Sequence, residues 1–269
     1  MKTARITLIF VLGVIAFSMT PKSVGASGQR GQRGGGGAPA QSPKAGAPFD
    51  MTGYWVSMVT EDWRYRMFTP LKGEYQGIPL NAEGRRVADT WDPAKDEAAG
   101  EQCRSYGAAN IMRVPERVHI TWQDDQTLKL ETDAGTQTRL FYFGIPNGQG
   151  GDWQGISKAS WDFDSGFGVP AQRFDPQFGQ FGKPAGGSLK VVTTRLKPGY
   201  LRKNGVPYSA NAVMTEYYDR VTEPNGDTYL VVTITVEDPM YLAQPYMTST
   251  SFRKQADASG WKPAPCKSR

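Results

Sequence analysis

Apolar and polar residues alternate along most of the chain after Ile111. In RVHITWQD, Val118, Ile120 and Trp122 are separated by polar residues, a period of two that is typical of a half-buried β-strand. Similar patterns predict strands over residues 53–59, 127–132, 137–143, 153–163, 188–196, 212–221, 228–238 and 246–254. EDWRYRMFTP is interpreted as a further extended piece that stops at Pro70. The chain is therefore predicted to be all-β.

One stretch, residues 81–102, follows a helical pattern instead. Asn81 stands where a helix cap is expected, and apolar residues recur at helical spacing up to Trp91. Asp92 and Pro93 divide the stretch into two short helices. We expect a short helical insert within the β-fold.

The predicted strands follow one another in mostly meandering order. Their number, roughly 9–11, favours an antiparallel, lipocalin-like barrel, because closure removes exposed strand edges. A sandwich of two sheets is the alternative. A barrel of this size has an interior that can hold one small ligand.

The amino-terminal region reads as an export signal followed by a linker. Lys2 and Arg5 precede a short apolar stretch, and small residues allow cleavage after Ala26. Residues 27–48 are rich in glycine, proline and arginine, and we expect them to be a disordered linker. Residues 49–266 form the predicted barrel domain, and 267–269 a tail. With no other long apolar run, no transmembrane segment is expected and the protein is predicted to be periplasmic or extracellular.

The net charge of +5 comes from the amino terminus. Six of the 31 lysines and arginines lie in residues 1–48, which contain no acid, so the remainder carries 25 cations against 26 acids. A nearly neutral domain gives no argument for nucleic-acid binding.

The two cysteines, Cys103 and Cys266, are predicted to form a disulfide, because an even pair in an exported protein most simply means one bridge. No cluster of histidines and cysteines accompanies either thiol. We therefore predict no metal site, and no cofactor is expected.

Two resemblances support this interpretation. Gly53 and Trp55, with Arg253 near the end of the last strand, are similar to the lipocalin signature, in which a cation packs across a tryptophan that closes the barrel. Blocks including TGYW, PLNAEGRR, QCRSYGA, GISKASW, LKPGYLRKNGVPYS and TEYYDR resemble a family of exported bacterial proteins of uncharacterised function. That resemblance implies an extracytoplasmic, lipocalin-like (calycin) β-fold and supplies no catalytic residues.

KPGYLRKNGVPYS, residues 197–209, carries more cationic and aromatic groups than a simple connection needs. If the TGYW end is the closed end of the barrel, this stretch lies at the opposite, open end. A ligand there could be contacted by Tyr200, Arg202, Lys203 and Tyr208. Alternatively, the tyrosines pack the loop onto the barrel rim and the cations face water.

The candidate ligand contacts combine aromatic and cationic side chains. They are Arg139, Tyr142, Trp161, Arg195, Arg202, Tyr208 and Tyr218. Glu216, on the same strand face as Tyr218, is a candidate general acid or base if desolvated. The alternative is a structural ion pair with Arg139 or Arg195. His119, the only histidine, lies opposite the apolar face and is predicted to face solvent.

Three functional hypotheses follow. The leading one is an extracytoplasmic protein that binds a small, partly apolar molecule in the barrel cavity. The second is a hydratase, isomerase or lyase that uses Glu216 in the same cavity. The third is an envelope protein that docks a partner through the phenylalanine-rich loop 164–187. Two other roles are open for this loop: it could be a lid over a binding site, or its phenylalanines could cover the outside of the sheet.

Overall fold

The computed structural model describes residues 41–163, 174–175, 180–181 and 187–268. The predicted signal peptide, residues 27–40 of the predicted linker and most of the loop 164–187 lie outside the described residues. Residues 41–48 form a turn rather than a disordered end of the linker. The amide of Gly46 donates to the carbonyl of Ser42 at 2.8 Å, and that of Lys44 donates to the carbonyl of Asp125 at 3.3 Å.

The described residues form five short helices and thirteen strands. The helices are α1 (Trp63–Met67), α2 (Ala82–Ala88), α3 (Pro93–Ala98), the 3-10 helix η1 (Gln102–Tyr106) and α4 (Ala108–Ile111). The strands are β1 (Gly53–Met58), β2 (Arg117–Trp122), β3 (Thr127–Thr132), β4 (Thr138–Tyr142), β5 (Ile156–Asp162), β6 (Phe174–Asp175), β7 (Gln180–Phe181), β8 (Ser188–Thr194), β9 (Gly199–Arg202), β10 (Val206–Tyr208), β11 (Val213–Thr222), β12 (Thr228–Glu237) and β13 (Tyr246–Lys254).

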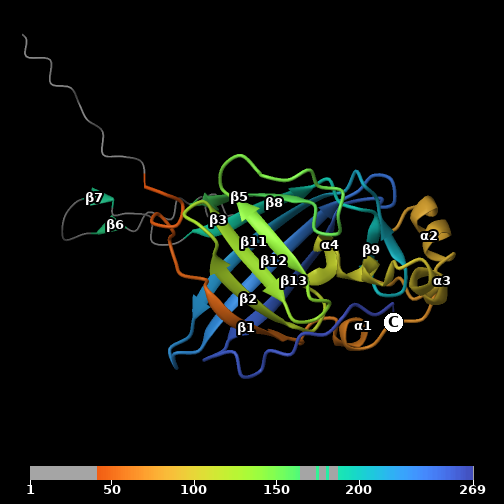
Figure 1. Cartoon of the computed structure of the whole chain (residues 1–269), viewed down its shortest axis with the longest axis horizontal. Helices are drawn as coiled ribbons and strands as arrows, with labels where there is room; N and C mark the ends of the chain where they lie inside the picture. Colours follow the sequence, from red (N-terminus) through yellow and green to blue (C-terminus); the bar gives the residue numbers. More distant parts are fainter. Residues whose placement is uncertain (1–40, 164–173, 176–179, 182–186, 269) are drawn as a thin grey trace, which may run out of the picture. The chain divides into compact units, whose positions relative to one another are not determined.

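Nine strands close into a barrel, which confirms the predicted all-β barrel and excludes the sandwich (Figure 1). Their order around the barrel is β1-β13-β12-β11-β8-β5-β4-β3-β2, and β2 pairs with β1 to complete the circle. The pairing is antiparallel with one exception, because β4 and β5 run parallel where Phe141 faces Ser157. The purely antiparallel prediction was therefore wrong at this pair, since the chain between them returns along the barrel before β5 begins.

The predicted helical insert is present, with the expected cap at Asn81 and a second cap at Asp92, where the two helices were predicted to separate. The Asn81 side chain accepts a hydrogen bond from the amide of Gly84 at 2.8 Å, and that of Asp92 accepts from the amide of Ala94 at 3.1 Å. Pro93 occupies the first turn of α3, where its missing N–H costs nothing.

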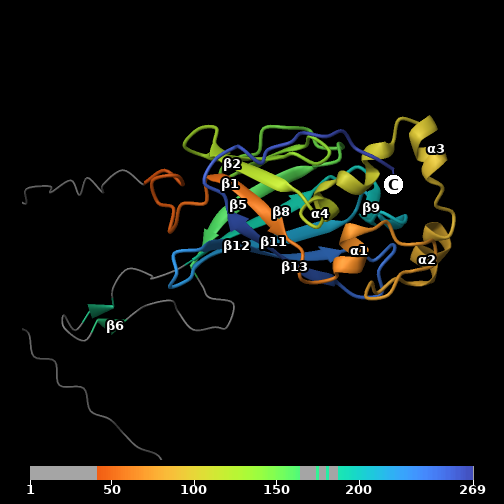
Figure 2. The same cartoon turned by 90° about the horizontal axis from the view of Figure 1, so that it is seen from below.

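The extended piece predicted at 61–70 was wrong, because α1 forms there. Its five residues are too short for a helical period to be recognised, and only its packing makes the helix persist. All helices of the described part lie in the connection from β1 to β2 and gather at one end of the barrel (Figures 1 and 2). We call this end the helix-covered end.

The core lies inside the barrel, where alternate residues of each strand point inward. The pattern predicted from the sequence is the one observed, since Val118 and Ile120 are fully buried. Other inward residues with at most 2% exposure are Trp55, Leu128, Leu130, Thr132, Arg139, Phe141, Ser157, Ala159, Leu189, Val191, Thr193, Met214, Glu216, Tyr218, Leu230, Val232, Ile234, Val236, Thr250 and Phe252.

Trp55 is fully buried, and its indole N–H donates to the carbonyl of Met51 at 2.9 Å. The cation above its ring is Lys254, with Nζ at 4.5 Å from the ring centroid, rather than Arg253. Neighbouring residues of a strand face opposite sides, so Arg253 points outward and forms an ion pair with Asp227 at 2.8 Å. The cation predicted to pack on Trp55 was therefore wrong by one position, since Lys254 takes the place expected for Arg253.

His119 is half-buried rather than solvent-facing. Its ring stacks on Tyr54 with centroids 4.0 Å apart, and Trp261 approaches the same ring edge-on. The segment after β13 folds back to cover this outer face. The alternation of residues within β2 cannot predict such a contact, because it comes from a distant part of the chain.

Cys103 and Cys266 form a disulfide with their Cα atoms 5.1 Å apart, as predicted. The bridge ties η1 to the carboxyl-terminal segment. That segment is also held against the β3–β4 turn, where the amide of Ala264 donates to the carbonyl of Asp133 at 2.8 Å.

Candidate functional site

The predicted ligand contacts do not converge on one place. Arg139, Glu216 and Tyr218 meet inside the barrel. Tyr142 points outward, because Arg139 and Phe141 take the inward positions of β4, and its hydroxyl donates to the carbonyl of Asn147 at 2.7 Å. Arg195 is exposed beyond the end of β8.

Trp161 lies on the inward face of β5, with Ser157 and Ala159, but near the end of the strand, where it packs against Phe143 and the edge of the core. Its indole N–H donates to the carbonyl of Pro43 at 2.8 Å, and the ring of Phe49 packs edge-on against it. This half-buried tryptophan therefore anchors the segment that precedes β1.

The buried polar group inside the barrel is an ion pair. Arg139 donates to both carboxylate oxygens of Glu216, at 2.9 and 2.5 Å, and neither side chain has any exposed surface. The Tyr218 hydroxyl donates to Glu216 at 2.9 Å. Of the two partners considered for Glu216, the structure selects Arg139.

The environment of the Arg139–Glu216 pair shifts the pKa values of Arg139 and Tyr218. Burial alone would lower the pKa of Arg139, but the charge of Glu216 and the hydroxyl of Tyr218 raise it above its ordinary value. Burial, followed by the negative charge of Glu216, raises the pKa of Tyr218 well above its usual range. The phenol therefore stays protonated and the guanidinium charged, which suits a structural network.

Residues 197–209 do not lie over an open end of the barrel. They form the β9–β10 hairpin, which packs against α2, α4 and η1, and Tyr208 is fully buried. The Arg202 guanidinium donates to the carbonyls of Glu74 and Gln76 at 3.2 and 3.0 Å and lies over the ring of Tyr65. Its polar and aromatic groups hold helices to the barrel, a combination of contacts that sequence spacing does not reveal.

A recess of about 230 Å³ lies between α2, α3 and η1 on one side and the hairpin on the other. We call it the α3–β9 recess. Its walls combine aromatic rings, prolines and charged groups: Val87, Thr90, Trp91, Asp92, Lys95, Asp96, Arg104, Pro198, Gly199, Tyr200, Gly205, Pro207, Tyr208 and Tyr241. The volume is somewhat below the roughly 300–1,000 Å³ of typical ligand pockets, so it suits a small molecule.

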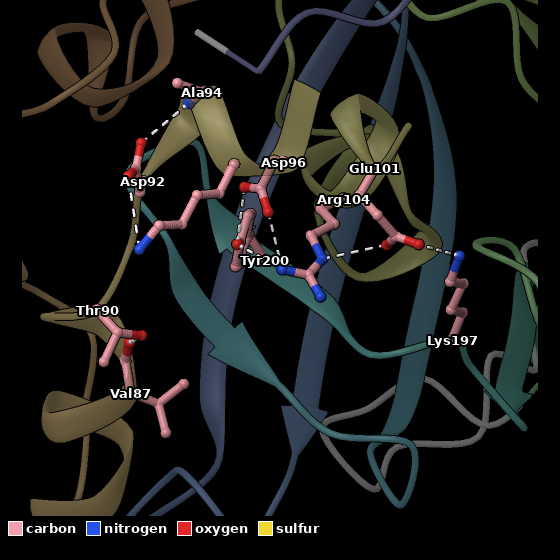
Figure 3. A network of polar contacts seen from close by, with 10 residues as sticks. Val87, Thr90, Asp92, Ala94, Asp96, Glu101, Arg104, Lys197 and Tyr200 are labelled. Carbon is pink, nitrogen blue, oxygen red and sulfur yellow. Dashed lines mark hydrogen bonds and ion pairs between the residues drawn. The ribbon is translucent and has the colours of Figure 1, made fainter. Parts of the chain in front are cut away.

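A hydrogen-bonded triad joins three elements in this recess (Figure 3). Arg104 Nη1 donates to Asp96 Oδ1 at 2.9 Å and to the Tyr200 hydroxyl at 3.0 Å. That hydroxyl donates to Asp96 Oδ2 at 2.9 Å. Glu101 accepts from Arg104 Nε at 3.3 Å and from Lys197 at 2.8 Å, which extends the network to the start of the hairpin.

Electrostatics keep Tyr200 protonated and Arg104 charged near neutral pH. Burial and the hydrogen bond to Asp96 raise the pKa of Tyr200 to about 12. Burial would lower the pKa of Arg104, but Tyr200, Asp96 and Glu101 together raise it. The hydrogen bond from Lys197 is the main cause that lowers the pKa of Glu101. Tyr200 and Arg104 therefore offer fixed hydrogen-bonding groups rather than groups that gain or lose a proton near neutral pH.

Two buried polar atoms of the recess residues have no hydrogen-bond partner within the described part of the chain. They are the indole N–H of Trp91, whose side chain is almost buried, and the hydroxyl of Tyr208. Buried polar groups in proteins nearly always have a partner, so each exception calls for an explanation. Burial also raises the pKa of Tyr208 well above its usual range, so its hydroxyl stays protonated.

Sequence reasoning found only part of this recess. Tyr200 and Tyr208 were singled out, whereas Asp96 and Arg104 lie in or just after the helical insert, to which no site was assigned. A signal was present, because Arg104 follows Cys103, and the predicted disulfide fixes that position in the fold.

Gly205 allows Trp91 to pack on the hairpin turn. Its φ is +81°, and an added Cβ would lie 2.2 Å from the Cβ of Trp91. We expect Gly205→Ala to lower the free energy of unfolding by about 2–4 kcal/mol, from left-handed strain and from displacement of the indole. Urea denaturation measures this loss.

The matched control is Gly226→Ala, where φ is +88° but nothing lies within 4 Å of the added Cβ. It should cost only the backbone strain, about 1–2 kcal/mol. Equal losses for the two variants would contradict the packing of Trp91 against Gly205.

Comparisons with protein-family models, curated proteins and solved structures found no match. Within the described residues, no group of three or more histidine, cysteine or acidic side chains is placed to hold a metal ion. Across the same residues, every helix is too short or too polar to cross a membrane.

Proposed function

We propose that this protein is an extracytoplasmic, lipocalin-like binding protein for a small, partly apolar molecule, and that the ligand lies in the α3–β9 recess. The observation that carries the proposal is the composition of the recess, in which the partly exposed Arg104 and Tyr200 present hydrogen-bonding groups beside aromatic walls. A ligand with polar groups at one edge can bond to these side chains while its apolar body covers the rings.

The charges of the recess favour a ligand with no net charge. Asp96 pairs with Arg104 at 2.9 Å, and Asp92 lies 3.8 Å from Lys95. Because positive and negative groups balance, a net charge on the ligand would find no counterpart. The partly exposed rings of Tyr200 and Tyr241 suit a flat or cyclic apolar body, and the triad suits hydroxyl or amide groups at its edge.

The barrel interior is a less favourable place for the ligand than the recess. Large side chains such as Trp55, Phe141 and Phe252 fill it, and its polar group is the closed Arg139–Glu216 pair. The same pairing counts against Glu216 as a general acid or base, since both carboxylate oxygens are already bound. Most of the loop 164–187, through which the docking hypothesis binds a partner, lies outside the described residues.

The disulfide supports the extracytoplasmic part of the proposal. Cysteine pairs persist as disulfides in oxidising compartments and are rare in the reducing cytosol. The sequence-predicted export signal points to the same location.

Filling the recess tests the proposal. Val87, half-buried on α2, lines the recess, and Val87→Trp should occupy it. Ligand-observed ¹⁹F NMR with a set of uncharged, ring-containing fluorinated fragments provides the readout. We expect fragments to bind the wild type and to bind Val87→Trp at least about tenfold more weakly, a loss of about 1.4 kcal/mol.

Val221→Trp is the matched control, because it adds the same side chain at an exposed position near the far end of β11. It should keep wild-type binding. Fragments that bind all three proteins equally, or none that bind the wild type, would refute the recess as the binding site.

A further inference from the structure

A second, much smaller cavity lies under the turn of the β9–β10 hairpin. Its volume of about 10 Å³ leaves room for one occupant about the size of a water molecule or a single-atom ion. Half of its lining residues are cationic: Tyr65, Arg66, Asn110, Arg113, Val114, Leu201, Arg202 and Lys203. Among described residues, none that lines it is acidic.

Two of these cations have carboxylate partners that lie outside the cavity lining. Arg66 forms an ion pair with Glu61, and its other nitrogens donate to the Arg113 carbonyl at 2.9 Å and the Ser57 hydroxyl at 2.8 Å. Arg113 Nη2 donates to Asp62 at 2.7 Å. The charges of Arg66 and Arg113 are therefore compensated.

The other two cations are not compensated by an ion pair with any described residue. Arg202 donates to backbone carbonyls, and Lys203 donates to the Tyr106 hydroxyl at 3.3 Å and lies over its ring. The four cations thus exceed their two carboxylate partners by two positive charges.

Glu116, which interacts electrostatically with Arg66 and Lys203, does not restore the balance. It is buried, and both of its carboxylate oxygens lack a hydrogen-bond partner among the described residues. Burial, reinforced by the negative charge of Asp133, raises the pKa of Glu116 well above its usual range. Because burial disfavours its charged form, Glu116 contributes little negative charge towards the cavity.

One donor of the cavity lining is also free. Arg113 is 5% exposed, and its Nη1 is buried with no partner among the described residues. Burial lowers the pKa of both Arg66 and Arg202, and the charge of Arg113 lowers each further. The cavity therefore combines an unmet N–H donor with mutually repelling buried cations.

We propose that this cavity binds a single small inorganic anion of halide size, with Arg113 Nη1 as its direct donor and Arg66, Arg202 and Lys203 supplying the positive potential. An anion removes the unmet donor and the repulsion together, whereas a water molecule removes only the first. The site is independent of the α3–β9 recess, and it would stabilise the attachment of the hairpin to the helix-covered end.

Replacing gluconate by chloride at constant ionic strength tests the proposal. We expect the urea midpoint of the wild type to rise with chloride concentration, because a ligand that binds only the folded state stabilises it by mass action. Arg113→Met should lose this dependence. Arg64→Met, which removes an exposed arginine paired with Glu74, should retain it.

Crystals of the wild-type protein soaked in bromide provide a second test that needs no variant. An anomalous peak in the cavity, together with the chloride-dependent midpoint, supports the site. Equal wild-type midpoints in chloride and gluconate would overturn it, and a bromide peak would then represent an adventitious ion only. A cavity without a peak, holding water alone, would overturn it as well.

Discussion

Glu216→Leu is expected to lower the free energy of unfolding by about 3–5 kcal/mol, because it leaves the Arg139 guanidinium buried without a counter-charge. The side chains of the pair have no exposed surface, so water cannot replace the lost carboxylate. The Tyr218 hydroxyl also loses its acceptor. Denaturation in urea, with a check that the transition remains two-state, measures the effect.

A double variant separates the unpaired charge from the change in shape. Arg139→Met combined with Glu216→Leu replaces both charges by apolar groups, which is often neutral or stabilising relative to a buried ion pair. We expect it to recover much of the stability lost in Glu216→Leu. A double variant that is destabilised by the sum of the two single changes would show that the pair is not coupled.

Removal of the disulfide is the second change with a large expected effect. Cys103 and Cys266 are separated by 163 positions, so the bridge restricts the unfolded chain strongly. In the chain-entropy model the double variant Cys103→Ser/Cys266→Ser should lose about 4–5 kcal/mol of unfolding free energy. Because Arg104 is adjacent to Cys103, fragment binding in the α3–β9 recess should weaken as well.

Reduction of the wild type supplies the control for this prediction. A thiol reductant should lower the urea midpoint of the wild type towards that of the double serine variant and leave the variant unchanged. If reduced and oxidised wild type unfold at the same midpoint, the bridge does not contribute to stability.

Much of the fold could be predicted from local patterns. The period of two identified the nine barrel strands, because each strand must bury one face in the core and the sequence therefore alternates. Asn81 predicted the first cap of the insert, since a side-chain oxygen satisfies amides that a helix leaves free, and Asp92 with Pro93 predicted the break before α3. The cysteine pairing followed from the presence of only two thiols.

The candidate site was predicted only in fragments. Tyr200 and Tyr208 stood out by their type, but Asp96 and Arg104, which bond to Tyr200, and Trp91, which lines the same recess, lie far away in the sequence. The choice between Arg139 and Arg195 for Glu216 depended on where each strand ends, because only Arg139 lies on an inward position of a barrel strand.

The sequence by itself determined the secondary structure of the barrel, the faces of its strands and the one covalent cross-link. Each of these depends on neighbours within a few residues or on composition. Only the tertiary structure decided that the β9–β10 hairpin closes one end, that α1 is helical and that the recess lies outside the barrel. Those features arise from contacts between segments some hundred residues apart, such as Arg104 with Tyr200, whose energies no local pattern records.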